Sequence, residues 1–148
     1  RFFSKQDQHA IALAVEEAEH GHVGEIQVVI EGSLPSRSAY YQDTLCRARQ
    51  LFAELGVWDT EHNSGVLVYL NLCDHKVEIV IDRGIKQATS QEVWDQICQN
   101  IIQQLKQKKF KTGVIEGVIE IGKVLDLYYD RKIDDLKNEL GNKPIILG

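Results

Sequence analysis

Apolar side chains recur three and four positions apart in four stretches of the chain, the spacing that places them on one face of an α-helix. The first stretch follows Ser4, and Asp7 three positions later completes the pattern of a capping box, so a helix should begin directly after Ser4. The four apolar stripes consist of Ile11, Ala14, Val15 and Ala18; Leu45, Ala48, Phe52 and Leu55; Trp94, Ile97, Ile101 and Leu105; and Val114, Val118, Ile121, Leu125 and Tyr128.

Three other stretches have patterns typical of β-strands. Residues 26–30 and 77–81 alternate apolar side chains with Gln27 and Glu78, and residues 66–70 are apolar throughout, as in a strand covered on both faces. Only the short turn at Asp74-His75 separates the second strand from the third. These two strands should therefore form an antiparallel hairpin.

The order helix, strand, helix, strand, strand, helix, helix predicts a three-layer α/β/α sandwich. Its small mixed sheet would contain a parallel βαβ unit with a right-handed crossover and one antiparallel hairpin strand, flanked by helices. We expect a single domain over residues 1–136 and an extended C-terminal tail over residues 137–148, because the tail has no apolar period.

Two local patterns refine the later helices. Thr89 followed by Glu92 has the form of a capping box and predicts the start of the third helix. Gly113 and Gly117, four positions apart, favour a close approach between the fourth helix and a neighbour. Trp58 and Trp94 are expected in the core or in a pocket wall.

Composition narrows the classes of function. The 148 residues are 43% hydrophobic and 26% charged, as expected for one globular domain. The net charge of −5 argues against a general affinity for nucleic acid. No apolar run approaches the roughly 20 residues that span a bilayer. The three cysteines are scattered without a Cys-x-x-Cys pair, which argues against a zinc knuckle or a redox dithiol.

Polar residues should gather where the second strand starts and the antiparallel third strand ends. Residues 58–63 precede the second strand, Asp82 and Arg83 follow the third, and the first strand starts at the same end. We call this end the acidic pole. Its residues are Asp59, Glu61, Asn63, Asp82 and Arg83, with His20, His22 and Glu25 beside them.

Two interpretations of the acidic pole stay open. Carboxylates and an amide oxygen suit a hard cation, so Asp59, Asp82 and Asn63 are candidate ligands for Ca²⁺ or Mg²⁺. Glu61 is then the candidate to orient or deprotonate water, and Arg83 the candidate to bind phosphate oxygens. Alternatively Asp59 and Glu61 cap a turn, while Asp82 and Arg83 form a surface ion pair.

The opposite end of the sheet ranks second as a site. Ligands of open α/β sheets favour the carboxyl ends of parallel strands, which point this way. The polar residues there are ordinary turn formers: Glu31, Ser33, Ser36, Asn71 and Asp74.

A basic cluster follows the third helix. It comprises Lys106, Lys108, Lys109 and Lys111. Cations at a helix C-terminus complement the helix dipole, which is the simpler explanation. The alternative is contact with an anionic membrane surface.

Several catalytic signatures are missing from the sequence. It has no Gly-x-Gly-x-x-Gly, no Gly-Lys-Ser/Thr loop, no Gly-x-Ser-x-Gly elbow, no Cys-x₅-Arg and no Asp-x-Asp-x-Thr. Hydrolysis by this chain would therefore need a metal-activated water.

The segment from Val57 to Tyr69, with Trp58-Asp59-Thr60-Glu61-His62 at its start, resembles the TPM-domain family, in particular a bacterial branch with this motif. Matching residues continue through most of the chain: Arg47-Ala48, Leu51-Phe52, Val77 to Val80, Asp82 to Ile85, Phe110, Gly113, Gly117, and the closing segment from Asn138 to Pro144. The chain departs from the commoner pattern at Ser64, which interrupts Asn-Gly, and at Asp82-Arg83-Gly84, which replaces Gly-x-Gly.

The resemblance implies an α/β/α sandwich and several kinds of activity. Some plant members of the family are described as acid phosphatases of the thylakoid lumen. Animal members act as accessory proteins of membrane receptors, and some bacterial members are tethered to membranes. Divalent metal binding has been associated with the fold, although one fold hosts many functions.

Two functions therefore follow as expectations. The first is an accessory or binding module with a divalent-metal site at the acidic pole, in a bacterial cytoplasm or at a membrane, with a protein partner. The second is a metal-assisted phosphatase that hydrolyses phosphomonoesters, with Glu61 and Arg83 in the catalytic roles.

Overall fold

The computed structural model describes residues 3–21, 24–32, 43–128 and 141–148. In chain order the elements are α1 (Lys5–Ala18), β1 (Glu25–Glu31), α2 (Thr44–Glu54), β2 (Gly65–Asn71), β3 (Lys76–Ile81), α3 (Arg83–Ala88), α4 (Gln91–Lys106), α5 (Phe110–Tyr128) and β4 (Ile145–Leu147). The four apolar stripes of the sequence correspond to α1, α2, α4 and α5, and its three strand patterns to β1, β2 and β3.

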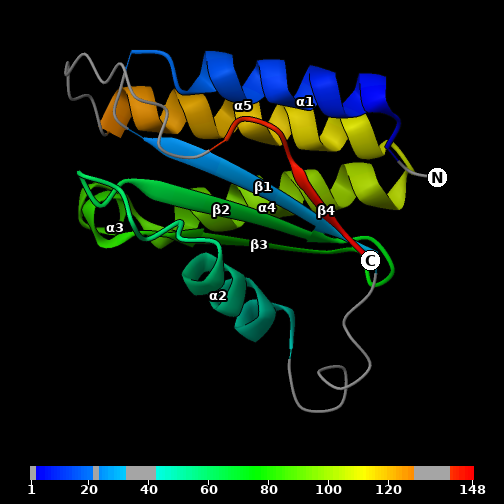
Figure 1. The fold of residues 1–148 in the computed structure, drawn as a ribbon, viewed down its shortest axis with the longest axis horizontal. Helices are drawn as coiled ribbons and strands as arrows, with labels where there is room; N and C mark the ends of the chain where they lie inside the picture. Colours follow the sequence, from blue (N-terminus) through cyan, green and yellow to red (C-terminus); the bar gives the residue numbers. More distant parts are fainter. Residues whose placement is uncertain (1–2, 22–23, 33–42, 129–140) are drawn as a thin grey trace.

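The four strands form one mixed sheet in the order β3-β2-β1-β4 (Figure 1). β1 and β2 are parallel, with Glu25 opposite Gly65 and Glu31 opposite Asn71. β2 and β3 are antiparallel, with Val66 opposite Ile81. The predicted mixed sheet, with its parallel βαβ unit and its hairpin, is confirmed.

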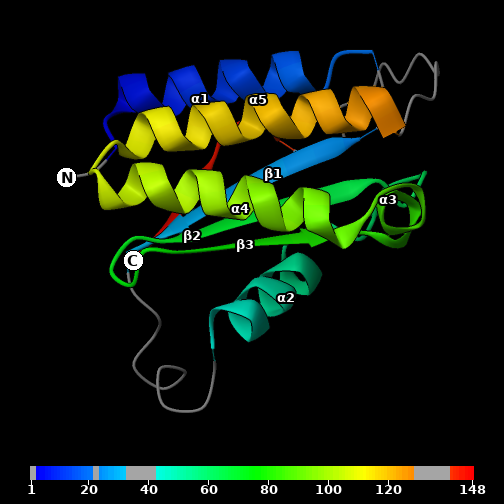
Figure 2. The same ribbon diagram turned by 180° about the vertical axis from the view of Figure 1, so that it is seen from behind.

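Helices cover both faces of the sheet and complete the three layers. One core packs β1 and β2 against α1, α4 and α5, which lie together on one face (Figure 2). A smaller core packs the other face against α2 through Ala48 and Leu51. Every residue of β1 and β2 is buried as a result, including the polar Glu25, Gln27 and Glu31.

Two predicted local features are confirmed. Ser4 and Asp7 form a reciprocal capping box at the start of α1, with each side chain bound to the other backbone N–H at 3.0 and 3.1 Å. The glycines of α5 allow close packing on α4, because a Cβ on Gly117 would lie 2.5 Å from Ile101 Cδ1 and one on Gly113 would lie 2.9 Å from Gln104 Cβ.

The predicted capping box at Thr89 is wrong. α4 begins one residue later, after Ser90, which makes no side-chain cap. The Thr89 hydroxyl instead donates to the carbonyl of Ile85 at 2.8 Å and accepts from Trp94 Nε1 at 2.8 Å. The Thr89 hydroxyl therefore joins α3 to α4 instead of capping α4.

Two elements were not predicted. α3 is a single short helix that starts directly after Asp82, where the sequence indicated only the end of a strand. β4 lies within the expected C-terminal tail and pairs in parallel with residues 29–31 of β1. The backbone N–H of Gly32 donates to the Leu147 carbonyl at 3.1 Å, so the end of the chain is fastened to the sheet.

Candidate functional site

The two segments that were predicted to form the acidic pole do meet. The N–H of Gly84 donates to the Asn63 carbonyl at 3.1 Å, and the N–H of Asp82 donates to the Gly65 carbonyl at 3.0 Å. These bonds tie the loop before β2 to the junction of β3 and α3. The two segments therefore lie side by side, as the predicted antiparallel hairpin requires.

The loop before β2 is held by its own short side chains. The buried Ser64 donates its N–H to Thr60 Oγ1 at 2.9 Å, and the two hydroxyl oxygens lie 3.5 Å apart. Asn63 adopts a positive φ of 52°, which asparagine tolerates better than most residues. A Cβ on Gly65 would lie 2.1 Å from the Val57 carbonyl oxygen, so only glycine allows this crossing of the loop over β2.

The two carboxylate oxygens of Asp82 differ in their hydrogen bonding. Oδ1 accepts the N–H of Arg83 at 2.8 Å and so caps α3, whereas Oδ2 is buried with no hydrogen-bond partner. A buried carboxylate oxygen without a donor is costly, and a cation would relieve that cost. Asp82 and Arg83 are thus joined as a helix cap.

The other acids of the pole are exposed. Asp59 and Glu61 both face solvent, and Glu61 Oε2 lies 3.8 Å from Nε2 of the half-buried His62. Within the described ranges, no group of three or more His, Cys, Asp or Glu side chains is arranged to hold a metal. A cation at Asp82 would therefore need amide or backbone oxygens, such as those of Asn63, among its ligands.

Three further residues were expected beside the acidic pole. Glu25 is only 4% exposed and lies opposite Gly65 of β2. Asp82 lies on the other side of Gly65, to which it donates its N–H. His20 is exposed in the turn after α1. His22 lies outside the described residues.

The two tryptophans have opposite environments. Trp94 is 1% exposed and belongs to the core, as predicted. Trp58 is 54% exposed, so of its two expected positions, in the core or in a pocket wall, the core one is wrong. Its indole N–H donates to the Ala53 carbonyl at 3.1 Å, which fixes the ring at the surface next to Asp59. An anchored, exposed indole is suited to contact with a partner.

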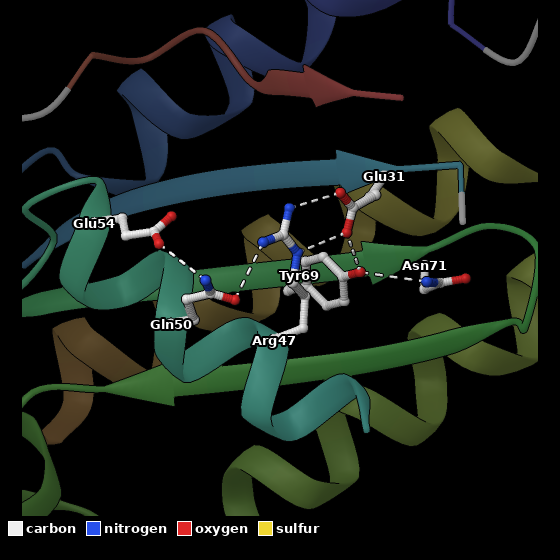
Figure 3. A network of polar contacts seen from close by, with 6 residues as sticks. All are labelled: Glu31, Arg47, Gln50, Glu54, Tyr69 and Asn71. Carbon is white, nitrogen blue, oxygen red and sulfur yellow. Dashed lines mark hydrogen bonds and ion pairs between the residues drawn. The ribbon is translucent and has the colours of Figure 1, made fainter. Parts of the chain in front are cut away.

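A buried polar network occupies the opposite end of the sheet (Figure 3). Arg47 of α2 binds Glu31 through two bonds, Nε to Oε1 at 3.0 Å and Nη2 to Oε2 at 2.8 Å. The Tyr69 hydroxyl donates to Glu31 Oε1 at 2.7 Å and accepts from Asn71 Nδ2 at 3.3 Å. The Asn71 side-chain oxygen accepts the N–H of Asp74 at 3.0 Å and fixes the hairpin turn.

The network keeps its charges. Burial would raise the pKa of Glu31, but hydrogen bonds from Arg47 and Tyr69 and the charge of Arg47 hold it below its usual value. Burial and the bond to Glu31 raise the pKa of Tyr69 far above its usual value. Because both oxygens of Glu31 have protein partners, this arrangement is suited to holding α2 on the sheet.

Sequence reasoning found only part of this network. Glu31, Asn71 and Asp74 were named at this end, while Ser33 and Ser36 lie outside the described residues. Arg47 and Tyr69 were missed as members. One signal was available: Arg47 lies three positions after Thr44 and next to Ala48, on the buried stripe of α2, where an arginine requires a buried carboxylate.

The four lysines of the basic cluster surround the turn between α4 and α5, and we call them the basic turn. All four side chains are exposed, and Lys111 Nζ lies 3.7 Å from Asp7 Oδ1. α4 starts beside α3, at the acidic pole, and ends at the basic turn, so the two charged regions lie at opposite ends of that helix (Figures 1 and 2). Among the described residues, no helix is long and apolar enough to cross a membrane.

Comparisons with known proteins agree with this architecture. A family model described as the TPM domain matches residues 1–124. The solution structure of protein BA42 from the psychrophilic bacterium Bizionia argentinensis is similar over 100% of this chain and 97% of its own, with 31% identity and a TM-score of 0.85. A comparison with curated proteins found no match.

Two more distant structures share the fold. The N-terminal domain of a P. gingivalis protein has 18% identity and a TM-score of 0.73, over 89% of this chain and 82% of that one. The N-terminal domain of a Corynebacterium glutamicum protein has 13% identity and a TM-score of 0.63, over 97% of this chain and 80% of that one.

Proposed function

The chain belongs to the TPM-domain family, and from that premise we propose that it is an accessory binding module whose acidic pole takes Ca²⁺ or Mg²⁺ together with a protein partner. The motif at Trp58 to His62 further leads us to assign it to the bacterial branch that carries this motif. The proposal concerns the surface formed by residues 57–64 and 82–84.

One observation carries the cation part of the proposal. Asp82 Oδ2 is buried without a hydrogen-bond partner, although Oδ1 of the same carboxylate is fully engaged as a helix cap. The backbone carbonyl of Asn63 accepts the N–H of Gly84, so the segment that carries Asn63 is held next to the segment that carries Asp82. Hard oxygen donors of this kind suit Ca²⁺ and Mg²⁺.

The partner part rests on Trp58. Its ring is more than half exposed and is held by the bond to Ala53 beside the exposed Asp59 and Glu61. A fixed aromatic ring within a charged rim is a common centre of protein interfaces, because it loses little side-chain entropy on binding. A bound cation would reduce repulsion among the neighbouring carboxylates and so favour docking.

The test is a titration of the pure protein with CaCl₂ and with MgCl₂, followed by the backbone amide signals in NMR. We expect saturable shifts at Asn63, Arg83 and Gly84 that are lost in Asp82→Asn, because asparagine still caps α3 but lacks the charge. Asp74→Asn, an exposed acid of the hairpin turn, is the matched control and should titrate like the original protein. Equal binding by both variants would sink the cation site.

The alternative function is metal-assisted hydrolysis of phosphomonoesters, with Glu61 acting on water and Arg83 holding phosphate. The same protein is therefore assayed on p-nitrophenyl phosphate with Mg²⁺, Mn²⁺ or Ca²⁺. Turnover that requires the cation and falls at least about a hundredfold in Arg83→Gln or Glu61→Gln would replace the binding module by an enzyme. Cation binding without turnover supports the module.

We also propose that the basic turn contacts an anionic membrane surface. Its lysines are exposed on one short turn, and only Lys111 has an acid nearby among the described residues. Each such cation contributes about 1 kcal/mol near an anionic leaflet. Because this turn lies at the far end of α4 from the acidic pole, lipid contact would leave that pole open to a partner.

A further inference from the structure

β3 presents an open edge. The hydrogen bond from Asp82 to Gly65 fixes the ladder with β2, so the even-numbered residues of β3 bond to β2. The N–H and C=O groups of Val77, Ile79 and Ile81 therefore point away from β2. Within the described part of the chain, no strand pairs with this outer edge.

A groove of about 370 Å³ runs along this edge. Residues 78–81 of β3 form its floor, Leu45 and Arg49 of α2 stand on one side, and Trp94 and Cys98 of α4 stand on the other. The groove therefore lies along β3 between α2 and α4, and Figure 1 shows α2 next to β3 at this edge of the sheet.

We propose that this groove receives an extended peptide, which adds to β3 as a further strand with apolar side chains toward α4 and acidic side chains toward Arg49 and Lys86. The outward backbone groups of β3 repeat every second residue, about 6.8 Å apart. Such a row of alternating donors and acceptors is matched by another extended chain, as in known cases of strand addition.

The shape of the groove favours a peptide over a second copy of this chain. Its walls are helices that already occupy both faces next to the edge. A second copy would bring its own β3 flanked by its own α2 and α4, and these would compete for the same space. An extended peptide has no flanking helices and would not compete for this space.

The two walls differ in chemistry. On the α4 side, Ile79 and Ile81 are half-buried next to Trp94 and provide apolar surface, while the exposed Gln91 and Asp95 also line this side. On the α2 side Arg49 is exposed, and Lys86 of α3 is a second exposed cation of the lining. In the described residues neither donates a hydrogen bond to an acid of the groove.

The acids that line the groove are already engaged. Glu78 accepts from the Thr44 hydroxyl at 2.5 Å, and Asp95 accepts from Gln91 Nε2 at 3.0 Å. These neutral donors leave both acids charged, and Arg49 and Lys86 are the lining groups that can donate to a ligand, so acidic side chains of a peptide can pair with them.

The Cys98 side chain lies where a peptide carbonyl would bind at this edge. The backbone N–H of Ile79 faces the Cys98 sulfur, which is a weak acceptor that a peptide carbonyl would replace at a gain. Burial, with the nearby charges of Glu78 and Asp95, raises the pKa of this thiol to about 12, so it stays neutral and does not repel a carbonyl oxygen.

The probe is a blocked hexapeptide of alternating valine and glutamate, titrated into the full chain and followed by NMR. We expect saturable shifts at Val77, Ile79 and Ile81 and at facing residues of α2 and α4. Two N-methylated forms, one methylated at every valine and one at every glutamate, test the strand geometry. An antiparallel peptide bonds to β3 through residues that face α4, its valines, and a parallel one through its glutamates.

Loss of binding in one methylated form and not in the other supports strand addition and gives its direction. Binding unchanged by either methylation, abolished by both, or absent from β3 overturns it.

Arg49→Glu should weaken binding by about fivefold through lost attraction and added repulsion, while Lys123→Glu on the distant α5 should not. Equal effects of the two would remove the acidic-peptide assignment. Concentration-dependent dimerisation through Ile79 and Ile81, seen by sedimentation, would replace the peptide by a second copy and overturn the proposal.

Discussion

Arg47 and Glu31 are joined by a two-bond ion pair that crosses from α2 to the end of β1, with side-chain exposures of only 12% and 4%. Because the segment between β1 and α2 is long, it does not by itself hold α2 against the sheet, and the ion pair provides a direct link between the two. Tyr69 and Asn71 extend the fastening to β2. The βαβ crossover thus has a polar lock at one end and the apolar contacts of Ala48 and Leu51 along its length.

Breaking this lock should destabilise the fold strongly. Arg47→Met leaves Glu31 buried with no counter-charge, which should lower the free energy of unfolding by about 3 kcal/mol at pH 7. The loss should shrink at low pH, where the abandoned carboxyl can take up a proton. Urea unfolding followed by circular dichroism measures both values. Arg49→Met, at an exposed site on the same helix, is the control, and similar losses in the two variants would contradict the lock.

The crossing of the loop over Gly65 gives a second prediction. Gly65→Ala places a Cβ where the Val57 carbonyl oxygen now lies, 2.1 Å away, and both atoms belong to rigid backbone surroundings. We expect a loss of about 2–3 kcal/mol in the free energy of unfolding, together with shifted amide signals at Asn63 and Gly84.

A matched glycine serves as the control for that crossing. Gly113→Ala meets Gln104 Cβ at 2.9 Å, a milder overlap than the 2.1 Å at Gly65, and alanine favours the helical backbone at this position. Its cost in thermal unfolding should therefore be smaller than that of Gly65→Ala. A reversed order of the two would show that the loop, rather than the helix pair, can adjust.

The sequence predicted the fold well where a physical signal was local and repeated. The stripes and the short turn at Asp74-His75 were enough to predict the helices and the hairpin, and Gly113 with Gly117 predicted the helix contact that the structure contains. β4 was not predicted because three residues are too few to show the alternating pattern of a strand. Its pairing also depends on β1, over a hundred positions earlier.

The candidate site was predictable only in part, because pairing across the fold decides what a polar residue does. Strand order alone brought the Asn63 and Asp82 segments together, and the structure confirms it. Nothing local distinguished Thr89, which joins two helices, from a helix cap. The position of Arg47 on the buried stripe of α2 indicated a carboxylate partner, but only tertiary contacts decide that Glu31 and Tyr69 join it in the network.

Lipid contact at the basic turn predicts salt-dependent binding. Replacing Lys108 and Lys109 by glutamine should weaken co-sedimentation with vesicles containing phosphatidylserine by about tenfold or more, since each cation contributes about 1 kcal/mol near an anionic surface. Raising the salt concentration should weaken binding of the original chain in the same direction. Lys86 and Lys123, replaced together, provide a control with equal charge loss away from this turn. Binding insensitive to salt, or reduced equally by the control, would contradict the prediction.

Glu19 should make the stability of the fold fall as the pH rises. This half-buried side chain lies at the end of α1, where Oε2 accepts the N–H of Ile26 at 2.8 Å. Burial raises its pKa from 4.5 to about 8, against the lowering effect of that hydrogen bond, with a further increase from the charge of Glu16. Between these two pH values the folded chain keeps a proton that the unfolded chain releases, so the free energy of unfolding decreases with rising pH across this window.

Glu19→Gln removes this titration while its amide oxygen can still accept from Ile26, because glutamine is neutral at every pH. The variant should match the original chain near pH 4.5 and exceed it in stability near pH 8, with the difference growing steadily between the two. Urea midpoints measured at intervals over this range give the slope for each protein. Glu17→Gln, at an exposed position of α1, should keep the slope of the original chain. If Glu19→Gln also keeps that slope, Glu19 is ionised in the folded protein and the link between α1 and β1 is a charged one.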